Sequence, residues 1–480
     1  MTARDFLFGS ACDLQARIRS RDLSCVEVVN AHLEQVNRVN PKLNALVTRV
    51  DSQALDRAQE LDQRLQRGED IGPLGGLPVA HKDLSSTQGV RTTFGTLSMA
   101  NHVPTENSLV VQRMHDAGAI MLGKTNTPEY GAGSHTFNEI FGVTANPYDP
   151  TRSCGGSSGG AAVVLAAGMA ALAEGSDMGG SLRNPAAWCN ICGLRPTPGR
   201  VPMWPAKSPT ATLPVEGPMA RTIEDLALFM AVIGPPDPCS PLSQSLEPLD
   251  FSSDLSEVTT GLRIALAADY GGLLPLAEGM PDYVTEAARE LAGLGAHIEY
   301  GCPDLSDADV IFKTLRADLY AKLLGDGLDN HRDTYKATLI SNIEQGLALN
   351  ADQVALACKQ QVALIDRVSE FFTRYDFLLL PVTQVHPFPI EQEYPREIAG
   401  QSMDSYLDWM KSCYFITVAG NPALSVPAGF TSEGWPVGVQ IVGRYGDDAG
   451  VLRLGYALQQ ATNHWRTRPS MPYGNHHVPT

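Results

Sequence analysis

The sequence is short of positive charge. Its 36 lysine and arginine residues face 53 aspartate and glutamate residues, and the formal net charge is −17. This deficit argues against nucleic acid or an anionic membrane surface as a partner, because both are negatively charged. The sequence also lacks any run of eighteen apolar residues, so it predicts no membrane span. With 43% hydrophobic and 19% charged residues, it has the composition of an ordinary soluble globular protein with a large core.

Cysteine shows no pattern of paired bridges. Nine cysteines, an odd number, are scattered through 480 residues, and the apolar stretch within residues 1–8 is too short for a secretory signal. We therefore expect reduced thiols and a cytoplasmic protein. Cys189 and Cys192 form a lone CxxC motif without a second ligand pair, which favours packing over zinc or redox chemistry. No metal and no cofactor is predicted.

Internal repeats, low-complexity tracts and clear linkers are absent too, although the length alone suggests about three domains. Apolar periodicity and turn residues predict alternating strands and helices, which indicate an α/β fold with a mixed or parallel central sheet and helices on both faces. Residues 1–70 and 306–372 are expected to be mostly helical. The remaining predicted helices cover 108–117, 159–170, 226–233, 285–291 and 448–461, and the predicted strands cover 43–50, 77–81, 120–123, 172–176, 263–268, 297–301, 377–380, 423–426 and 437–442.

The sequence does contain one lysine and two glycine-serine clusters at suggestive positions. Lys82 ends a predicted strand, residues 155–160 read Gly-Gly-Ser-Ser-Gly-Gly, and residues 175–183 read Gly-Ser-Asp-Met-Gly-Gly-Ser-Leu-Arg. A serine needs a base before it attacks a carbonyl carbon, and a lysine in a dry site can be neutral enough to serve. Glycines before Ser181 leave backbone N–H groups free for an oxyanion. The sequence thus offers candidates for a nucleophile, a base and oxyanion donors, but no obvious catalytic histidine.

Two other interpretations of these glycines are weaker. Residues 155–159 satisfy G-x-S-x-G, the nucleophile elbow of α/β-hydrolases, but that motif needs a strand just before it and residues 146–152 contain two prolines. An elbow enzyme would also need a later histidine, and His464, His476 and His477 lie in unremarkable polar surroundings. A nucleotide-binding module is not supported either, because no phosphate-binding loop follows a predicted strand.

These residues resemble the amidase signature family of hydrolases. The resemblance includes the Lys82 segment, residues 123–126 (Gly-Lys-Thr-Asn), both glycine-serine clusters with their spacing, residues 192–200, and the later stretches 420–427 and 436–443. It implies one amidase signature domain over residues 1–480, with an N-terminal helical segment at 1–70, a signature core at 70–225 and a variable substrate-pocket segment at 235–400.

The resemblance also implies roles for single residues. Ser181 matches the nucleophile, Lys82 the base, and Ser157 a bridging serine that follows a cis peptide bond from Gly156. The backbone N–H groups of Met178, Gly179, Gly180 and Ser181 are expected to face the oxyanion, and Gly131 is placed where the family lines its acyl pocket. Among the neighbouring residues, Ser158 is expected to support the loop, Asp177 and Arg183 to brace it, and Lys124 to be structural.

The resemblance implies hydrolysis of a small or medium carboxamide, with anilides, carbamates or esters as alternatives. A second alternative within the family is the A subunit of glutamyl-tRNA amidotransferase, although residues 300–420 do not resemble that branch. Departures from the family pattern are His81, where an apolar residue is usual, Cys154, where proline is common, and Met178, where a smaller residue is frequent. The expected partner is a small-molecule amide, and a homodimer is possible.

Overall fold

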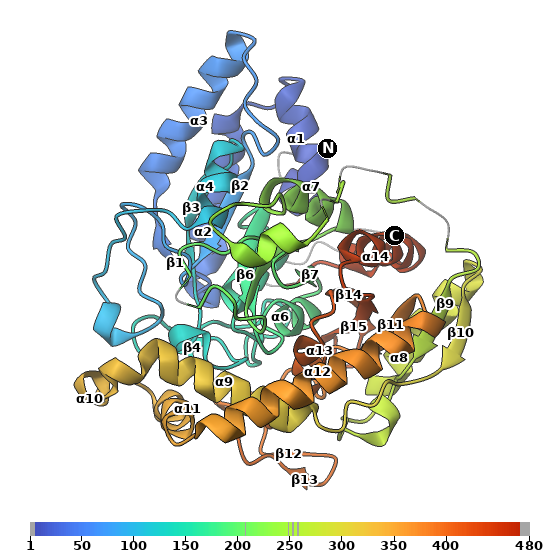
Figure 1. The fold of residues 1–480 in the computed structure, drawn as a ribbon. Coiled ribbons are helices and arrows are strands. Elements are labelled where there is room, and N and C mark those ends of the chain that lie inside the picture. Colours follow the sequence, from blue (N-terminus) through green and yellow to red (C-terminus); the bar gives the residue numbers. More distant parts are fainter. Residues whose placement is uncertain (1–4, 207, 248, 252–253, 257–258, 471–480) are drawn as a thin grey trace.

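The computed structural model describes residues 5–206, 208–247, 249–251, 254–256 and 259–470 (Figure 1). Its centre is an eleven-stranded sheet in the order β1-β3-β2-β6-β8-β7-β14-β15-β11-β9-β10. The strands are β1 (Leu46–Arg49), β2 (Pro78–Lys82), β3 (Ile120–Thr125), β6 (Leu172–Asp177), β7 (Cys192–Arg195), β8 (Val215–Ala220), β9 (Arg263–Leu266), β10 (His297–Tyr300), β11 (Phe377–Pro381), β14 (Ala423–Phe430) and β15 (Pro436–Gly443). Two short hairpins lie outside it, formed by β4 (Phe137–Asn138) with β5 (Gly142–Val143) and by β12 (Glu397–Ile398) with β13 (Gln401–Ser402).

Helices pack on both faces of this sheet, so the predicted α/β class and the single mixed-sheet domain are confirmed (Figure 1). The helices are α1 (Ala11–Arg19), α2 (Cys25–Leu43), α3 (Asp51–Gln66), α4 (Leu109–Asp116), α5 (Gly159–Ala166), α6 (Arg183–Trp188), α7 (Ile223–Ile233), α8 (Met280–Gly293), α9 (Ala308–Leu324), α10 (Leu328–His331), α11 (Ala337–Leu347), α12 (Ala351–Arg374), α13 (Lys411–Ala419) and α14 (Asp448–Thr462). Helices α9, α11 and α12 pack together along the lower edge in Figure 1.

Strand direction decides where the candidate residues meet. β2 lies between β3 and β6 and runs parallel to both, so the carboxyl ends of these three strands reach the same edge of the sheet. β2 ends at Lys82 and β6 ends at Asp177, just before the second glycine-serine cluster. Helix α5 starts at Gly159, within the first cluster, and packs on β2, β3 and β6. The fold therefore brings both clusters to the lysine.

Several expected boundaries differ from the structure. The apolar spacing after Ser24 predicts a helix capped by this serine, and Ser24 does cap α2, because its side chain accepts from the Glu27 N–H. From the sequence, Pro41 is expected to end this helix, but the helix continues to Leu43, because a proline can kink a helix without ending it. The predicted strand at 43–50 is shorter, at Leu46–Arg49. Within the described ranges, no helix is long and apolar enough to cross a membrane.

Candidate active site

The amine of Lys82 lies among three serine hydroxyls. The side chain is fully buried, and Nζ donates hydrogen bonds to Ser157 Oγ at 2.7 Å, Ser158 Oγ at 2.8 Å and Ser176 Oγ at 3.0 Å. The predicted proximity of Lys82 and Ser157 is therefore present in the structure. Ser158, expected only to support the loop, contacts the same amine at nearly the same distance. Ser176 was not singled out from the sequence.

Close backbone packing lets the first cluster reach the lysine. The Gly156–Ser157 peptide bond is cis, as the resemblance implied. A Cβ atom at Gly175 would lie 2.6 Å from Ser158 Oγ, so a side chain there would displace this serine. Ser158 in turn accepts from the Ser176 N–H and donates to the Ser176 carbonyl oxygen. Glycine in β6 thus allows the serine loop to sit directly on the strand that carries Ser176.

Asp177 holds the loop that carries Ser181. Its carboxylate accepts from the N–H groups of Gly180 and Leu182, both at 3.0 Å, and from the guanidinium of Arg183 at 2.9 and 3.0 Å. Arg195 approaches the same carboxylate at 3.4 Å, and all three side chains are fully buried. Burial alone would raise the pKa of Asp177, but the charges of both arginines hold it well below its usual range. The expected bracing role of Asp177 and Arg183 agrees with these contacts.

Ser181 lies beside the first cluster. The Ser158 N–H donates to the Ser181 carbonyl oxygen at 3.2 Å, and only 6% of Ser181 is exposed. The N–H of Gly180 was expected to face an oxyanion, but it already donates to Asp177. For the N–H groups of Met178, Gly179 and Ser181, the described chain offers no acceptor. These three groups are therefore the candidate oxyanion donors.

An apolar wall surrounds this loop. Met178 packs against two hydrophobic clusters, one of which contains Tyr320 of α9 and Leu339 of α11. A Cβ atom at Gly179 would lie 2.8 Å from Met410 Cε and 3.4 Å from Phe312 Cζ. Helix α9 and the segment before α13 therefore contribute side chains next to the oxyanion donors. Phe312 lies within the segment 235–400, whose role in shaping a substrate pocket stays a prediction, whereas Met410 lies outside it.

Gly131 lies close to Ser157 of the first serine cluster. A Cβ atom at this position would lie 3.4 Å from Ser157 Oγ and 3.0 Å from Leu84 Cδ1. Its φ of +70° is in the left-handed region that favours glycine. The Gly131 backbone thus approaches Ser157 closely, and its position at an acyl pocket stays a prediction.

Burial sets the protonation of the lysine. Loss of water around the amine lowers the pKa of Lys82 to about 7, although the carboxyl groups of Glu174, Asp177 and Glu216 act in the opposite direction. Burial also raises the pKa of Glu216 to about 8, which weakens the negative charge that this neighbour presents to the amine near pH 7. Near neutral pH, a substantial fraction of Lys82 is thus the free amine, which can accept a proton.

Lys124 does not share this environment. Its amine donates to the Ser85 carbonyl oxygen and to Thr87 Oγ1, which lies 2.8 Å away. Burial lowers the pKa of Lys124 to about 8, but the amine has no serine cluster beside it. These contacts agree with the structural role expected for this residue.

The nucleophile-elbow interpretation finds no support in the structure. The residues just before Ser157 form a loop with isolated bridges at Arg152 and Ser153, rather than a strand. His464 lies in a short 3-10 helix after α14, where a Cβ atom at Gly429 would lie 3.9 Å from its Nε2 atom. His476 and His477 lie outside the described residues. In the described chain, no group of three metal-ligating side chains is arranged to hold a metal ion.

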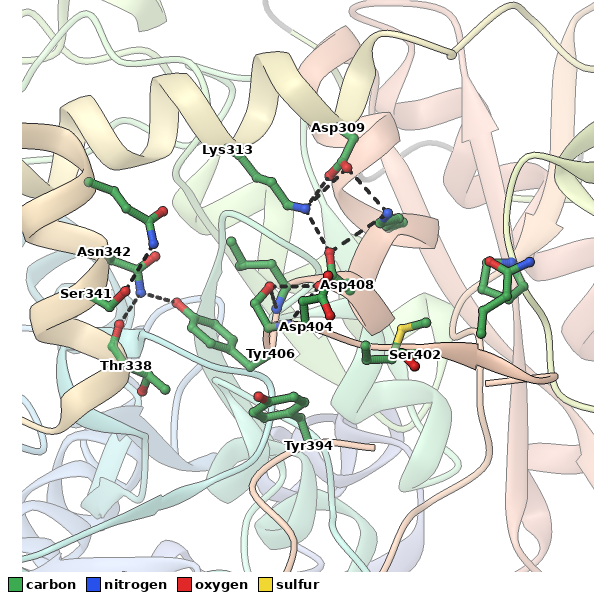
Figure 2. Close-up of a pocket in the computed structure, with 17 residues that line it drawn as sticks. Asp309, Lys313, Thr338, Ser341, Asn342, Tyr394, Ser402, Asp404, Tyr406 and Asp408 are labelled. Carbon is green, nitrogen blue, oxygen red and sulfur yellow. Dashed lines mark hydrogen bonds and ion pairs between the residues drawn. The ribbon is translucent and has the colours of Figure 1, made fainter. Parts of the chain in front are cut away.

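Figure 2 shows a cavity of about 580 Å³ next to this region, between α9, α11 and residues 394–411. Asp309 and Asp408 form ion pairs there with Lys313 and Lys411. Lys82, Ser157 and Ser181 do not line this cavity. Phe312 and Met410, which approach the Gly179 position, directly precede the lining residues Lys313 and Lys411 in the sequence.

Comparisons with known proteins agree with this geometry. A family model described as Amidase matches residues 27–452. The chain is 36% identical over 474 residues to an acylamidase of Rhodococcus erythropolis, covering 97% of this chain and 98% of that protein. It is 34% identical over 499 residues to the A subunit of the glutamyl-tRNA(Gln) amidotransferase of Carboxydothermus hydrogenoformans, covering 96% of this chain and 99% of that protein.

The fold agrees as well. The structure of a bacterial aryl acylamidase of the amidase signature family superposes with a TM-score of 0.88 at 30% identity, covering 95% of this chain and 98% of that one. Family model, sequence relatives and fold thus lead to one conclusion: the chain belongs to the amidase signature family of amide-hydrolysing enzymes.

Proposed function

We propose that the protein is an amidase that hydrolyses the C–N bond of a small or medium carboxamide by way of a Ser181 acyl-enzyme. The contact of the fully buried Lys82 amine with Ser157 Oγ at 2.7 Å carries this proposal. It provides a base that is partly neutral near pH 7 and is already hydrogen-bonded to a serine beside the Ser181 loop. The proposed steps use only groups of this chain, and no metal or cofactor enters them.

In the proposed mechanism, Ser181 Oγ attacks the amide carbonyl carbon. Its proton passes to Ser157 Oγ while the Ser157 proton passes to the Lys82 amine. The N–H groups of Met178, Gly179 and Ser181 donate to the oxyanion of the tetrahedral intermediate. As this intermediate collapses, the C–N bond breaks and the relay returns the proton to the leaving nitrogen. Water then attacks the ester carbonyl, gives its proton to the same relay, and releases the acid and free Ser181.

The substrate class follows from the wall around the oxyanion donors. Met178, Phe312 and Met410 are apolar, so they favour an uncharged acyl group over a charged one. Anilides, carbamates and esters present the same kind of carbonyl carbon and are alternative substrates. The acylamidase and the aryl acylamidase that the chain resembles support an N-acyl substrate. Similarity to the A subunit of the amidotransferase supports a second function, release of ammonia from glutamine for a partner.

A substrate panel with a nucleophile variant tests the proposal. Purified protein is incubated with aliphatic and aromatic carboxamides, anilides, carbamates, esters and glutamine, and Ser181→Ala is run beside it. We expect hydrolysis of at least one uncharged amide by the wild type, and loss of that activity in Ser181→Ala. Equal turnover by the variant would exclude Ser181 as the nucleophile, and exclusive hydrolysis of glutamine would support the amidotransferase function instead.

A further inference from the structure

A second cavity lies behind the catalytic lysine, on the opposite face of β2. Side chains alternate along a strand, so Val79 and His81 point away from the face that carries the Lys82 amine. Val79 and His81 line a cavity of about 420 Å³, which α3 and α4 cover with residues such as Ala54 and Val111. Its volume falls within the range of small-molecule sites.

Two polar groups in this cavity are unsatisfied. The His81 side chain is 97% buried, and its Nδ1 atom has no hydrogen-bond partner among the described residues. Glu174 Oε1, at 3.8 Å from His81 Nδ1, is too distant to bond. Arg57 Nε is also buried without an acceptor in the described chain, although Arg57 Nη1 pairs with Glu60. Buried polar groups normally have partners, so both groups indicate a missing ligand.

The chemistry of the lining favours an anion. Aspartate and glutamate do not occur among the described residues that line this cavity, whereas Arg57 and His115 do. Lys124 adds a second amine nearby, because its Nζ donates to Thr87 Oγ1 and Thr87 lines the cavity.

Much of the remaining lining is apolar, although Gln53, Gln88, Asn107 and Gln112 also line the cavity. Val50, Ala54, Val79, Val111, Ala119 and Met121 line the cavity between the polar groups. Burial lowers the pKa of His81 to about 3, so this imidazole is neutral and can donate one hydrogen bond to an anionic oxygen. We propose that the cavity is a second small-molecule site, which binds a monocarboxylate with a small apolar body between Arg57 and His81.

Titration calorimetry with benzoate tests this site without using catalysis. The comparators are benzyl alcohol, which has the same apolar body without the charge, and three variants. Arg57→Gln removes the cation, and Ala54→Leu fills the cavity from α3. Arg64→Gln is the matched control, because Arg64 lies on the same helix, pairs with Glu69 and does not line the cavity.

We expect benzoate to bind the wild type and Arg64→Gln equally, with benzyl alcohol at least tenfold weaker. Arg57→Gln should raise the Kd for benzoate at least tenfold, and Ala54→Leu should abolish binding. Failure of benzoate to bind the wild type with a Kd below about 1 mM would overturn the proposal and leave water as the occupant. Binding that neither Arg57→Gln nor Ala54→Leu weakens would overturn it too, because the carboxylate would then bind elsewhere, for example as a product beside Ser181.

Discussion

At the scale of single residues, the burial of Lys82 leads to a pH prediction. Its pKa is lowered to about 7, so the amine is protonated below this pH and cannot accept the proton of Ser157. We expect kcat/KM to rise about tenfold per pH unit below pH 7 and to level off above it. The measurement is a pH profile from 5.5 to 9 on a substrate whose hydrolysis limits the rate. A flat profile would contradict Lys82 as the base.

The three hydroxyls around this amine should not be equivalent. Ser157→Ala removes the proposed relay and should lower kcat by about 10²–10⁴-fold, which is typical for a proton-transfer group. Ser158→Ala removes one hydrogen bond to the amine and should lower kcat by about 10–100-fold. Steady-state kinetics on both variants test this order, with Ser402→Ala on the exposed β13 as control. A larger loss for Ser158→Ala would move the relay to Ser158.

At the scale of elements, the link between β6 and α6 depends on one buried carboxylate. Asp177→Asn would leave Arg183 and Arg195 buried without their counter-charge, and should lower the free energy of unfolding by about 3–5 kcal/mol. The folded-state pKa of Asp177 lies below its unfolded value of 3.8, so its contribution is fully present at pH 7 and is lost as the pH falls below about 4. Urea denaturation at pH 7 measures the difference.

The matched control for this prediction is Asp376→Asn. Asp376 pairs with Arg444, but 23% and 47% of these two side chains are exposed. Its replacement should cost less than about 1 kcal/mol, because water screens the pair. Equal losses for both variants would mean that Asp177 does not brace the loop.

Elements with strong periodicity could be predicted from the sequence, whereas those without it could not. α3 lies within residues 1–70, which were expected to be mostly helical, and β6 is within one residue of its predicted range. Two elements were not predicted from the sequence. One is β8, which has Gly217 and Pro218 in its centre, and the other is α13, whose residues 412–419 are all buried. β8 depends on pairing with β6 and β7, and α13 on burial against α9 and α12. Such distant contacts leave no local pattern.

The candidate site likewise contains residues that the sequence reveals and residues that only the fold reveals. Lys82, Ser157 and Ser181 stand in recognisable motifs and were named from the sequence. Ser176 and Glu216 were missed, although they are directly opposite each other in the β6–β8 pair and act on the same amine. Only strand register brings Glu216 next to a lysine 134 positions earlier in the chain. Residues that act through pairing therefore need the fold before they can be found.

At the scale of the whole molecule, charge and family similarity give different expectations about partners. The amidotransferase relative, to which the chain is 34% identical, is by its name part of a tRNA-dependent reaction. The net charge of −17 opposes binding of a polyanion to the isolated chain. A stand-alone amidase needs neither tRNA nor a second kind of protein chain. Activity and tRNA-binding assays on the isolated chain therefore distinguish the two functions.

We expect the purified chain, as a monomer or homodimer by light scattering, to hydrolyse an uncharged carboxamide at a rate that added tRNA does not change. We also expect no shift of labelled tRNA in a mobility assay at about 50 mM salt, where electrostatic binding would be strong. Glutamine should be a poor substrate, because Met178, Phe312 and Met410 provide no partner for its α-ammonium and carboxylate groups. Glutamine turnover that exceeds that of every uncharged amide, and that rises when tRNA is added, would instead assign the chain to the amidotransferase branch.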